Sequence, residues 1–103
     1  MNGLRYHCTE LIVNFADRDC RSLWETGRCR RLPASIRESA GKKLAILDAA
    51  ADLAELLVPP GNRLEKLRGD RAGQHAIRIN DQYRICFIWK DGNAHNVEIV
   101  DYH

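Results

Sequence analysis

The chain has 103 residues, of which 45% are hydrophobic and 29% are charged, and its formal net charge is +2. This length allows one hydrophobic core without a separate cofactor-binding domain, and the composition excludes disordered and fibrous proteins. No run approaches the ~20 apolar residues of a membrane span and no apolar signal segment is visible, so we expect a cytoplasmic protein.

The first half of the chain predicts one strand followed by two helices. Residues 1–10 are mixed polar and are interpreted as an N-terminal extension, and 11–15 is a short apolar run typical of a buried strand. Residues 16–19 offer a helix N-cap, and Gly27 ends that short helix. Pro33 fits the first turn of a second helix, which ends by Leu57. Its apolar positions recur at spacings of three and four residues: Ile36, Ala40, Leu44, Leu47 and Ala51.

The second half of the chain predicts a hairpin-rich sheet. The breaker at 58–62 ends the helical periodicity, and four runs then alternate with period two: 63–67, 75–79, 83–89 and 95–101. Short turns are expected at 80–82 and 91–93. In this pattern His75 and His95 fall on core-facing positions. The fold class is therefore α+β: one domain over 1–103, with an N-terminal strand and two helices packed on a mainly antiparallel sheet.

The four cysteines give no indication of a metal site. Cys8, Cys20, Cys29 and Cys86 include no C-x-x-C pair and no cysteine-histidine cluster at zinc spacing. We expect no metal and no cofactor. Reduced thiols are expected, with Cys86 inside a strand and the other three near the surface.

Basic residues gather in two segments. Six basic residues stand against one acidic residue in 28–43, and seven stand against three in 61–90. Such local excess can bind a phosphate backbone, although acidic residues elsewhere could balance both patches in the folded protein. The candidates for nucleic-acid contact are Lys42, Lys43, Arg63, Lys66, Arg68 and Arg71.

Standard catalytic signatures are absent from the sequence: there is no G-x-S-x-G motif, no phosphate-binding glycine loop and no H-E-x-x-H motif. Cleavage of RNA needs none of these, because the RNA 2′-hydroxyl is itself the nucleophile. A ribonuclease needs a base, an acid and a cation beside the scissile phosphate. Histidine, tyrosine, aspartate and arginine supply such groups without a metal.

Several short motifs resemble the RelE/HigB-type toxins of type II toxin-antitoxin systems, also called the plasmid maintenance killer protein family. The resemblance takes in 24–27 and the second helix and covers about nine-tenths of the chain, leaving out 1–10. The motifs stand in the family's order: Pro59, Gly61-Asn62-Arg63-Leu64, Leu67-Arg68-Gly69-Asp70-Arg71-Ala72-Gly73, Tyr83-Arg84-Ile85 and Val100-Asp101-Tyr102-His103.

The resemblance implies a RelE-like microbial ribonuclease fold and ribosome-dependent cleavage of messenger RNA. Translation inhibition and growth arrest would follow. The implied partners are the ribosome, its messenger RNA and a co-encoded helix-turn-helix antitoxin of the HigA type, with operator DNA reached only through the antitoxin.

The resemblance also assigns residue roles. His103 and Asp101 match family positions needed for activity, and Tyr102 lies between them. Arg84 matches a strand arginine expected to face the scissile phosphate, while Arg68 and Arg71 match a basic turn that approaches RNA. A frayed terminus is the alternative for 101–103, and plain solvation of a hairpin is the alternative for the basic turn.

One position departs from some family members, which carry a histidine where this chain has Glu65. Glu65 could act as the base, or it could pair with Arg84 or Arg68. Arg84 could in turn pair with Glu98 on the neighbouring strand. These alternatives leave a noncatalytic RNA- or ribosome-binding module as a second hypothesis, and a purely regulatory partner domain as a third.

Overall fold

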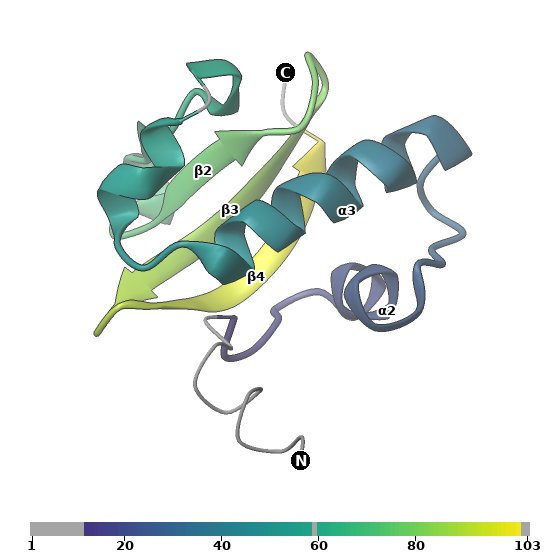
Figure 1. Ribbon diagram of the computed structural model, residues 1–103, viewed down its shortest axis with the longest axis horizontal. Coiled ribbons are helices and arrows are strands. Elements are labelled where there is room, and N and C mark those ends of the chain that lie inside the picture. Colours follow the sequence, from purple (N-terminus) through teal and green to yellow (C-terminus); the bar gives the residue numbers. More distant parts are fainter. Residues whose placement is uncertain (1–11, 59, 102–103) are drawn as a thin grey trace.

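Helices cover one face of a four-stranded antiparallel sheet in the computed structural model, which describes residues 12–58 and 60–101 (Figure 1). The helical elements are α2 (Arg18–Thr26), α3 (Ala34–Ala49) and three 3-10 helices, η1 (Leu53–Leu57), η2 (Pro60–Asn62) and η3 (Gly69–Arg71). The strands are β1 (Glu65–Lys66), β2 (His75–Arg78), β3 (Tyr83–Lys90) and β4 (Asn93–Asp101), adjacent in chain order. The predicted α+β class is confirmed. No helix within the described residues is long and apolar enough to span a membrane.

Local sequence signals set both ends of α2. The Asp17 carboxylate accepts a hydrogen bond from the backbone N–H of Asp19 at 2.9 Å, which satisfies one of the donors that a helix N-terminus leaves unpaired. At the other end, Gly27 has a φ of 78° and donates its N–H to the carbonyl of Leu23. A left-handed residue at this position is typical of glycine, so the predicted end of the helix is confirmed.

The second helix ends earlier than predicted. α3 stops at Ala49, so Ala50 is buried and Ala51 is exposed, contrary to the expected core position of Ala51. The cause is a second N-cap immediately downstream. Asp52 accepts from the N–H of Glu55, and the Glu55 carboxylate accepts from the N–H of Ala51, which together start η1 in a new direction.

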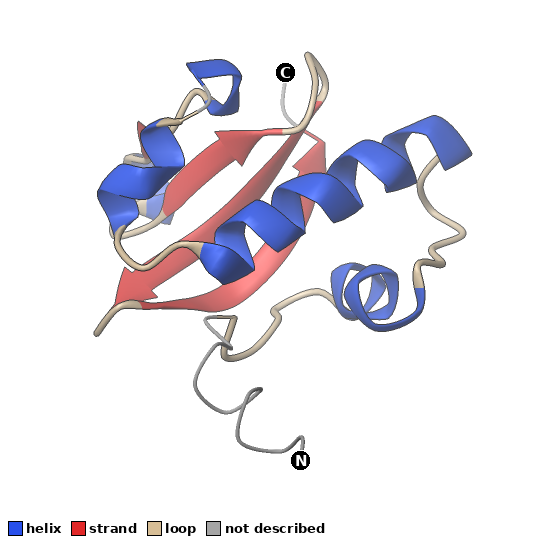
Figure 2. Ribbon diagram, viewed as in Figure 1, coloured by secondary structure: helices blue, strands red, loops and turns tan. Residues whose placement is uncertain are grey.

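Two antiparallel hairpins connect β2, β3 and β4, and Figure 2 shows their strands crossing behind α3. The β3–β4 turn uses Asp91 and Gly92 at φ 55° and 77°, the left-handed pair that suits the twist of a hairpin. The period-two alternation predicted for 83–89 is confirmed in β3: Ile85 and Phe87 join the main core, while Cys86 between them belongs to a small cluster on the opposite face.

A bulge changes the phase of β4. The β3–β4 register shifts between Cys86 and Ile88, and Asn96 has a φ of 52°. On the N-terminal side of the bulge, Ala94 packs in the core and His95 is in register with Ile88. The predicted core-facing position of His95 is therefore wrong, because period-two counting does not survive an extra residue in the strand.

The segment preceding α2 runs parallel to β4 at the bulge. It forms two isolated bridges, Ile12 with Ala94 and Phe15 with Val97, instead of a continuous ladder. The side chain of Asn14 accepts from the N–H of Asn96, and its carbonyl accepts from the N–H of Val97. The described part of the expected strand at 11–15 is thus an extended segment at the sheet edge, while Leu11 and the proposed extension at 1–10 lie outside the described residues.

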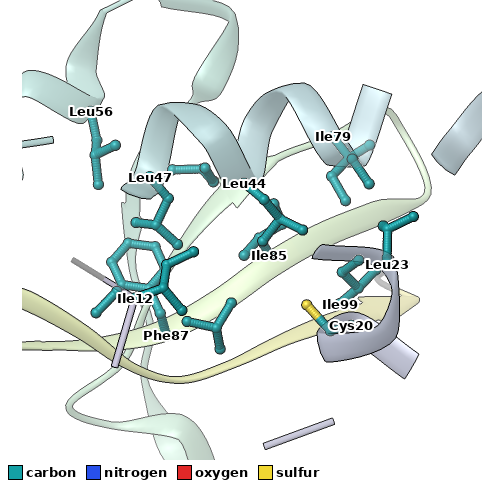
Figure 3. Packing of buried hydrophobic residues seen from close by; sticks show 14 of the residues in the cluster. Ile12, Cys20, Leu23, Leu44, Leu47, Leu56, Ile79, Ile85, Phe87 and Ile99 are labelled. Carbon is teal, nitrogen blue, oxygen red and sulfur yellow. The ribbon is translucent and has the colours of Figure 1, made fainter. Parts of the chain in front are cut away.

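The core fills the space between the helices and the sheet (Figure 3). Leu44 and Leu47 of α3 are fully buried, as are Ile85 and Phe87 of β3. Leu23 and Cys20 extend this layer from α2 toward Ile99 (Figure 3). Because both helices bury their apolar sides here, the opposite sheet face is left for other contacts.

Three cysteines occupy buried positions. Cys86 lies in β3 as predicted, whereas Cys20 and Cys29 are buried and not near the surface. Burial raises the pKa of the Cys20 thiol, and Asp17 reinforces this effect. Cys20 lies on the side of α2 that faces the core, together with Leu23. Cys8 lies outside the described residues.

Candidate functional site

The sheet face that α2 and α3 leave uncovered is called the open face below. Strand register arranges its side chains in two cross-strand rows. One row contains Glu65, Ala76, Cys86 and Glu98, and the next contains Arg78, Arg84 and Val100. Registered neighbours on antiparallel strands project from the same face, so these two rows bring residues from all four strands together.

Two arginines face each other in the second row. Arg78 of β2 is in register with Arg84 of β3. Each is held from the β2–β3 turn: the Arg78 guanidinium forms an ion pair with Asp81, and Arg84 Nη1 donates to the carbonyl of Asn80 at 2.6 Å. Like charges directly opposite each other on a sheet are destabilising, so this pair is suited to an anion that neutralises both.

The Glu98 carboxylate contacts an arginine other than the one considered from the sequence. Arg71 Nη1 in η3 donates to Glu98 Oε2 at 2.9 Å and to the side chain of Gln74 at 3.1 Å. The hydrogen bond to Glu98 keeps the pKa of Arg71 above its ordinary value. Arg71 therefore reaches across the open face from η3 to β4, and Glu98 pairs with Arg71 and not with Arg84.

A pocket of about 340 Å³ opens beside this arginine. It is lined by Glu65, Lys66, Leu67, Arg68 and Arg71. Leu67 is 7% exposed and belongs to the small open-face cluster with Ala76, Cys86 and Val100, so one wall is apolar. The structure thus brings the sequence candidates Glu65, Arg68 and Arg71 to one pocket. Lys66 also lines it, but Lys66 is in register with His75, so its side chain projects from the other face of the sheet.

Asp101 ends β4 beside the β2–β3 turn. Its side chain accepts a hydrogen bond from Gln82 Nε2 at 3.1 Å, and its backbone is in register with Tyr83. Tyr83 packs against the main core, whereas Arg84 pairs with Val100 on the open face. Asp101 and Arg84 therefore reach the same end of the sheet from opposite sides of its pleat. Tyr102 and His103, the other two terminal candidates, lie outside the described residues.

Three basic candidates lie away from the open face. Lys42 is exposed and Lys43 half-buried on α3, on the helical side of the molecule. Lys43 Nζ donates to the side chain of the fully buried Asn62, whose amide group donates in turn to the carbonyls of Leu56 and Val58. Arg63 is exposed after η2 with a φ of 47°. Lys43 thus ties α3 to η1 and η2, and the structure does not bring these residues to the pocket.

His75 remains on the helical side of the sheet, as the alternation predicted. Its ring stacks on Phe87 with centroids 6.0 Å apart, and its Nδ1 is buried without a hydrogen-bond partner in the described structure. Burial, with a smaller effect from Lys66, lowers the pKa of His75. His75 therefore packs against the core through its ring, and its burial disfavours the charged form.

Arg78 was missed as an individual site candidate by the sequence reasoning. Its alternation with Ile77 places it opposite the core, and its position six residues before Arg84, across a short turn, could have indicated that the two are neighbours. Among residues 12–58 and 60–101, no three His, Cys, Asp or Glu side chains gather as a metal site requires.

Comparison with known proteins identifies a matching family. The model of the RelE-like toxin HigB of type II toxin-antitoxin systems matches residues 13–103. Toxin HigB-1 of Vibrio cholerae serotype O1 is 42% identical over 87 residues, covering 84% of this chain and 92% of that protein. Endoribonuclease HigB of Proteus vulgaris is 30% identical over 97 residues, covering 90% of this chain and all of that protein. An uncharacterized protein of Haemophilus influenzae is 27% identical over 67 residues, covering 65% of this chain and 66% of that protein.

Proposed function

Because the chain belongs to the RelE-like HigB toxin family of type II toxin-antitoxin systems, we propose that it is a ribosome-dependent endoribonuclease that cleaves messenger RNA and stops translation. The observation that carries this proposal is the registered pair Arg78 and Arg84 on the open face. Two guanidinium groups side by side form a site for a phosphate, and they lie on the sheet face opposite the core that α2 and α3 cover.

In the proposed reaction the RNA 2′-hydroxyl attacks the adjacent phosphate. The attack forms a 2′,3′-cyclic phosphate and releases the 5′-oxygen of the next nucleotide, so the reaction needs no metal. Arg84 and Arg78 stabilise the extra negative charge on the phosphorus oxygens, which is greatest in the transition state. This role requires donors already in place, and the contacts of both arginines to the β2–β3 turn hold them there.

Proton transfer is assigned to the end of the chain. His103 and Tyr102 carry groups that can give or take a proton, and both follow Asp101 directly in sequence. Asp101 ends β4 beside the turn that holds Arg84, which supports placing the terminal residues at the scissile phosphate. In this arrangement Arg68, Arg71 and Lys66 bind RNA next to the reacting nucleotide.

The proposed partners follow from the same assignment. The toxin acts in the cytoplasm on the ribosome and its messenger RNA, and a HigA-like helix-turn-helix antitoxin neutralises it. The antitoxin supplies any contact with operator DNA. Arg63, Lys42 and Lys43 remain proposed RNA contacts outside the pocket, with Lys43 also serving the fold.

Induced expression followed by mapping of messenger 5′ ends tests this function. We expect growth arrest with new 5′ ends inside coding regions, and we expect His103→Ala to abolish both while the protein stays folded. Arg21→Ala is the matched control, because Arg21 is exposed on α2 and pairs with Glu25 one turn along the same helix. Undiminished cleavage by folded His103→Ala would refute the role of His103 in proton transfer. Intact messages after expression of the wild-type chain would refute the proposed endoribonuclease activity.

A noncatalytic ribosome-binding module is the second candidate. The observation in its favour is Glu65, which stands where some family members have a histidine and lies on the open face without an ion pair in the described structure. Such a module would bind ribosomes and leave messages intact. The same 5′-end map separates the two candidates, because new ends within codons require cleavage.

A further inference from the structure

β4 is an edge strand, so the backbone groups on its outer side need partners that the other strands of the sheet do not supply. The segment before α2 supplies them at Val97. The Val97 N–H donates to the carbonyl of Asn14 at 3.1 Å, and the Val97 carbonyl accepts from the N–H of Ala16 at 3.0 Å. Within residues 12–58, Ala16 makes the last backbone hydrogen bond of this segment to β4, and the chain then enters α2 at Arg18.

Arg31 continues these edge contacts two residues further along β4. From the loop between α2 and α3, Arg31 Nη2 donates to the carbonyl of Ile99 at 3.3 Å. Outward backbone groups recur at every second residue of a strand, so Ile99 is the next position after Val97 that requires an outside partner. A side chain thus takes the place of a neighbouring strand at this point of the edge.

Two carboxylates orient the Arg31 guanidinium toward β4. Nη2 also donates to Asp17 Oδ2 at 2.8 Å, and Nε donates to Asp19 Oδ2 at 3.0 Å. The other oxygen of Asp17 caps α2, so the same carboxylate fixes both the helix and the arginine. The Arg31 side chain is 39% exposed, and ion pairs with this exposure add little to folding stability. Their main effect here is to direct the guanidinium at the Ile99 carbonyl.

The anchored carbonyl lies directly before the proposed proton-transfer residues. Ile99 precedes Asp101 by two positions, and Tyr102 and His103 complete the chain. Because Ile99 uses its carbonyl on the outer side, the backbone groups of Val100 face β3, where Val100 is in register with Arg84. Successive residues at the end of β4 are therefore held from opposite sides.

We infer that Arg31 is a positioning residue of the ribonuclease, which fixes the end of β4 relative to Arg84. The inference rests on the proposed function, since it takes 101–103 as the proton-transfer residues and Arg84 as the phosphate contact. Arg31 acts through the Ile99 carbonyl and touches neither the RNA nor the reacting atoms. Arginine suits this role because its planar fork reaches three acceptors at once, whereas lysine offers a single nitrogen.

Native-state hydrogen exchange followed by NMR tests the anchoring without any cleavage. In Arg31→Ala we expect the amide of Val100 to exchange about tenfold faster, as for the loss of one charge-assisted hydrogen bond. The amide of Ile85, on the central strand β3, should keep its exchange rate. Arg31→Lys keeps the charge and should give a smaller change in the same direction, which also covers a failure of Arg31→Ala to fold. Arg30→Ala, at an exposed neighbour in the same loop, is the matched control.

Cleavage of a defined message on programmed ribosomes tests the effect on the reaction. We expect Arg31→Ala to lower kcat by about 10- to 100-fold, because small displacements of reacting groups are costly, and to leave KM for ribosomes unchanged. Arg31→Lys should recover part of kcat, and Arg30→Ala should keep both constants. A merely structural role would reduce the amount of active protein and restore full kcat once the folded fraction is counted.

The outcomes separate this inference from the proposed function. Unchanged exchange at Val100, or equal acceleration at Val100 and Ile85, would overturn the anchoring role. An unchanged kcat in Arg31→Ala would overturn the positioning role, and a raised KM at constant kcat would make Arg31 a ribosome contact instead. If the wild-type chain cleaves no message, the enzyme proposal fails on its own, and exchange at Val100 still decides whether Arg31 holds the end of β4.

Discussion

Arg78 and Arg84 repel each other across two strands in the free protein. Arg78→Ala should therefore leave thermal stability unchanged or raise it slightly, because Asp81, the partner in the lost ion pair, is exposed and surface pairs contribute about 0–1 kcal/mol. The same change should lower message cleavage by at least about tenfold if both arginines hold the reacting phosphate. Thermal unfolding and a cleavage assay on one preparation measure both effects. If Arg78→Ala is destabilised but fully active, Arg78 serves the fold and does not bind the reacting phosphate.

His75 gives the unfolding free energy a dependence on pH. Burial lowers its pKa below the ordinary value of about 6.5, so the unfolded chain takes up a proton before the folded chain does. Stability should be constant above this value and fall as the pH drops below it, down to the lowered folded pKa. Urea unfolding at pH 7.5 and 5.5 measures the loss, which should be smaller in His75→Gln. Equal losses in both proteins would contradict this account of His75.

The position of a side chain was predictable from the sequence where alternation along a strand sets the face from which it projects. The alternation in β3 places Arg84 away from the core, and the structure confirms this position. The partner of Glu98 was not predictable in the same way. Arg71 precedes it by 27 residues and reaches it only because η3 folds back over the open face, which depends on tertiary packing.

At the scale of elements, the bulge in β4 shapes the sheet edge. Asn96 has a φ of 52° and its N–H bonds to Asn14, which fixes the segment before α2 against β4. Asn96→Gly should be tolerated, since glycine adopts this backbone without strain. Asn96→Val should lower the free energy of unfolding by about 1–2 kcal/mol. Chemical denaturation compares the two variants, and equal stability would show that the left-handed backbone at 96 is not required.

Element boundaries were predictable where the signal is local. Gly27 and the Asp91-Gly92 turn carry their own conformational preference, and both behave as the sequence indicates. The end of α3 was not predicted, because the apolar spacing continues past Ala49 while the Asp52 and Glu55 cap competes with it. A pattern of apolar residues alone cannot show which of two compatible signals prevails.

At the scale of the whole molecule, the helices and the basic open face lie on opposite sides of one sheet. The net charge of +2 conceals this separation, because acidic residues such as Asp17 and Asp19 pair with Arg31 on the helical side. The open face carries Arg71, Arg78 and Arg84, each held in place by contacts within the protein. The basic segment at 61–90 is visible in the sequence, but only the fold shows which of its residues share one surface.

This separation predicts that ribosome binding depends strongly on salt. Each phosphate contact releases counterions, so affinity should fall steeply between 50 and 200 mM salt. Removing Arg68 should weaken binding and reduce the slope of log affinity against log salt by about one unit. Co-sedimentation with ribosomes at several salt concentrations measures this slope, with Arg21→Ala as a control. An unchanged slope in Arg68→Ala would mean that Arg68 does not contact a phosphate.

The central claim, that the open face cleaves messenger RNA on the ribosome, is tested most directly with purified components. A defined message is incubated with the wild-type protein or Arg84→Ala, with and without programmed ribosomes, and its 5′ ends are mapped. Cuts within codons should appear only with wild-type protein and ribosomes together. Equal cleavage of ribosome-free message, or full cleavage by folded Arg84→Ala, would contradict the account.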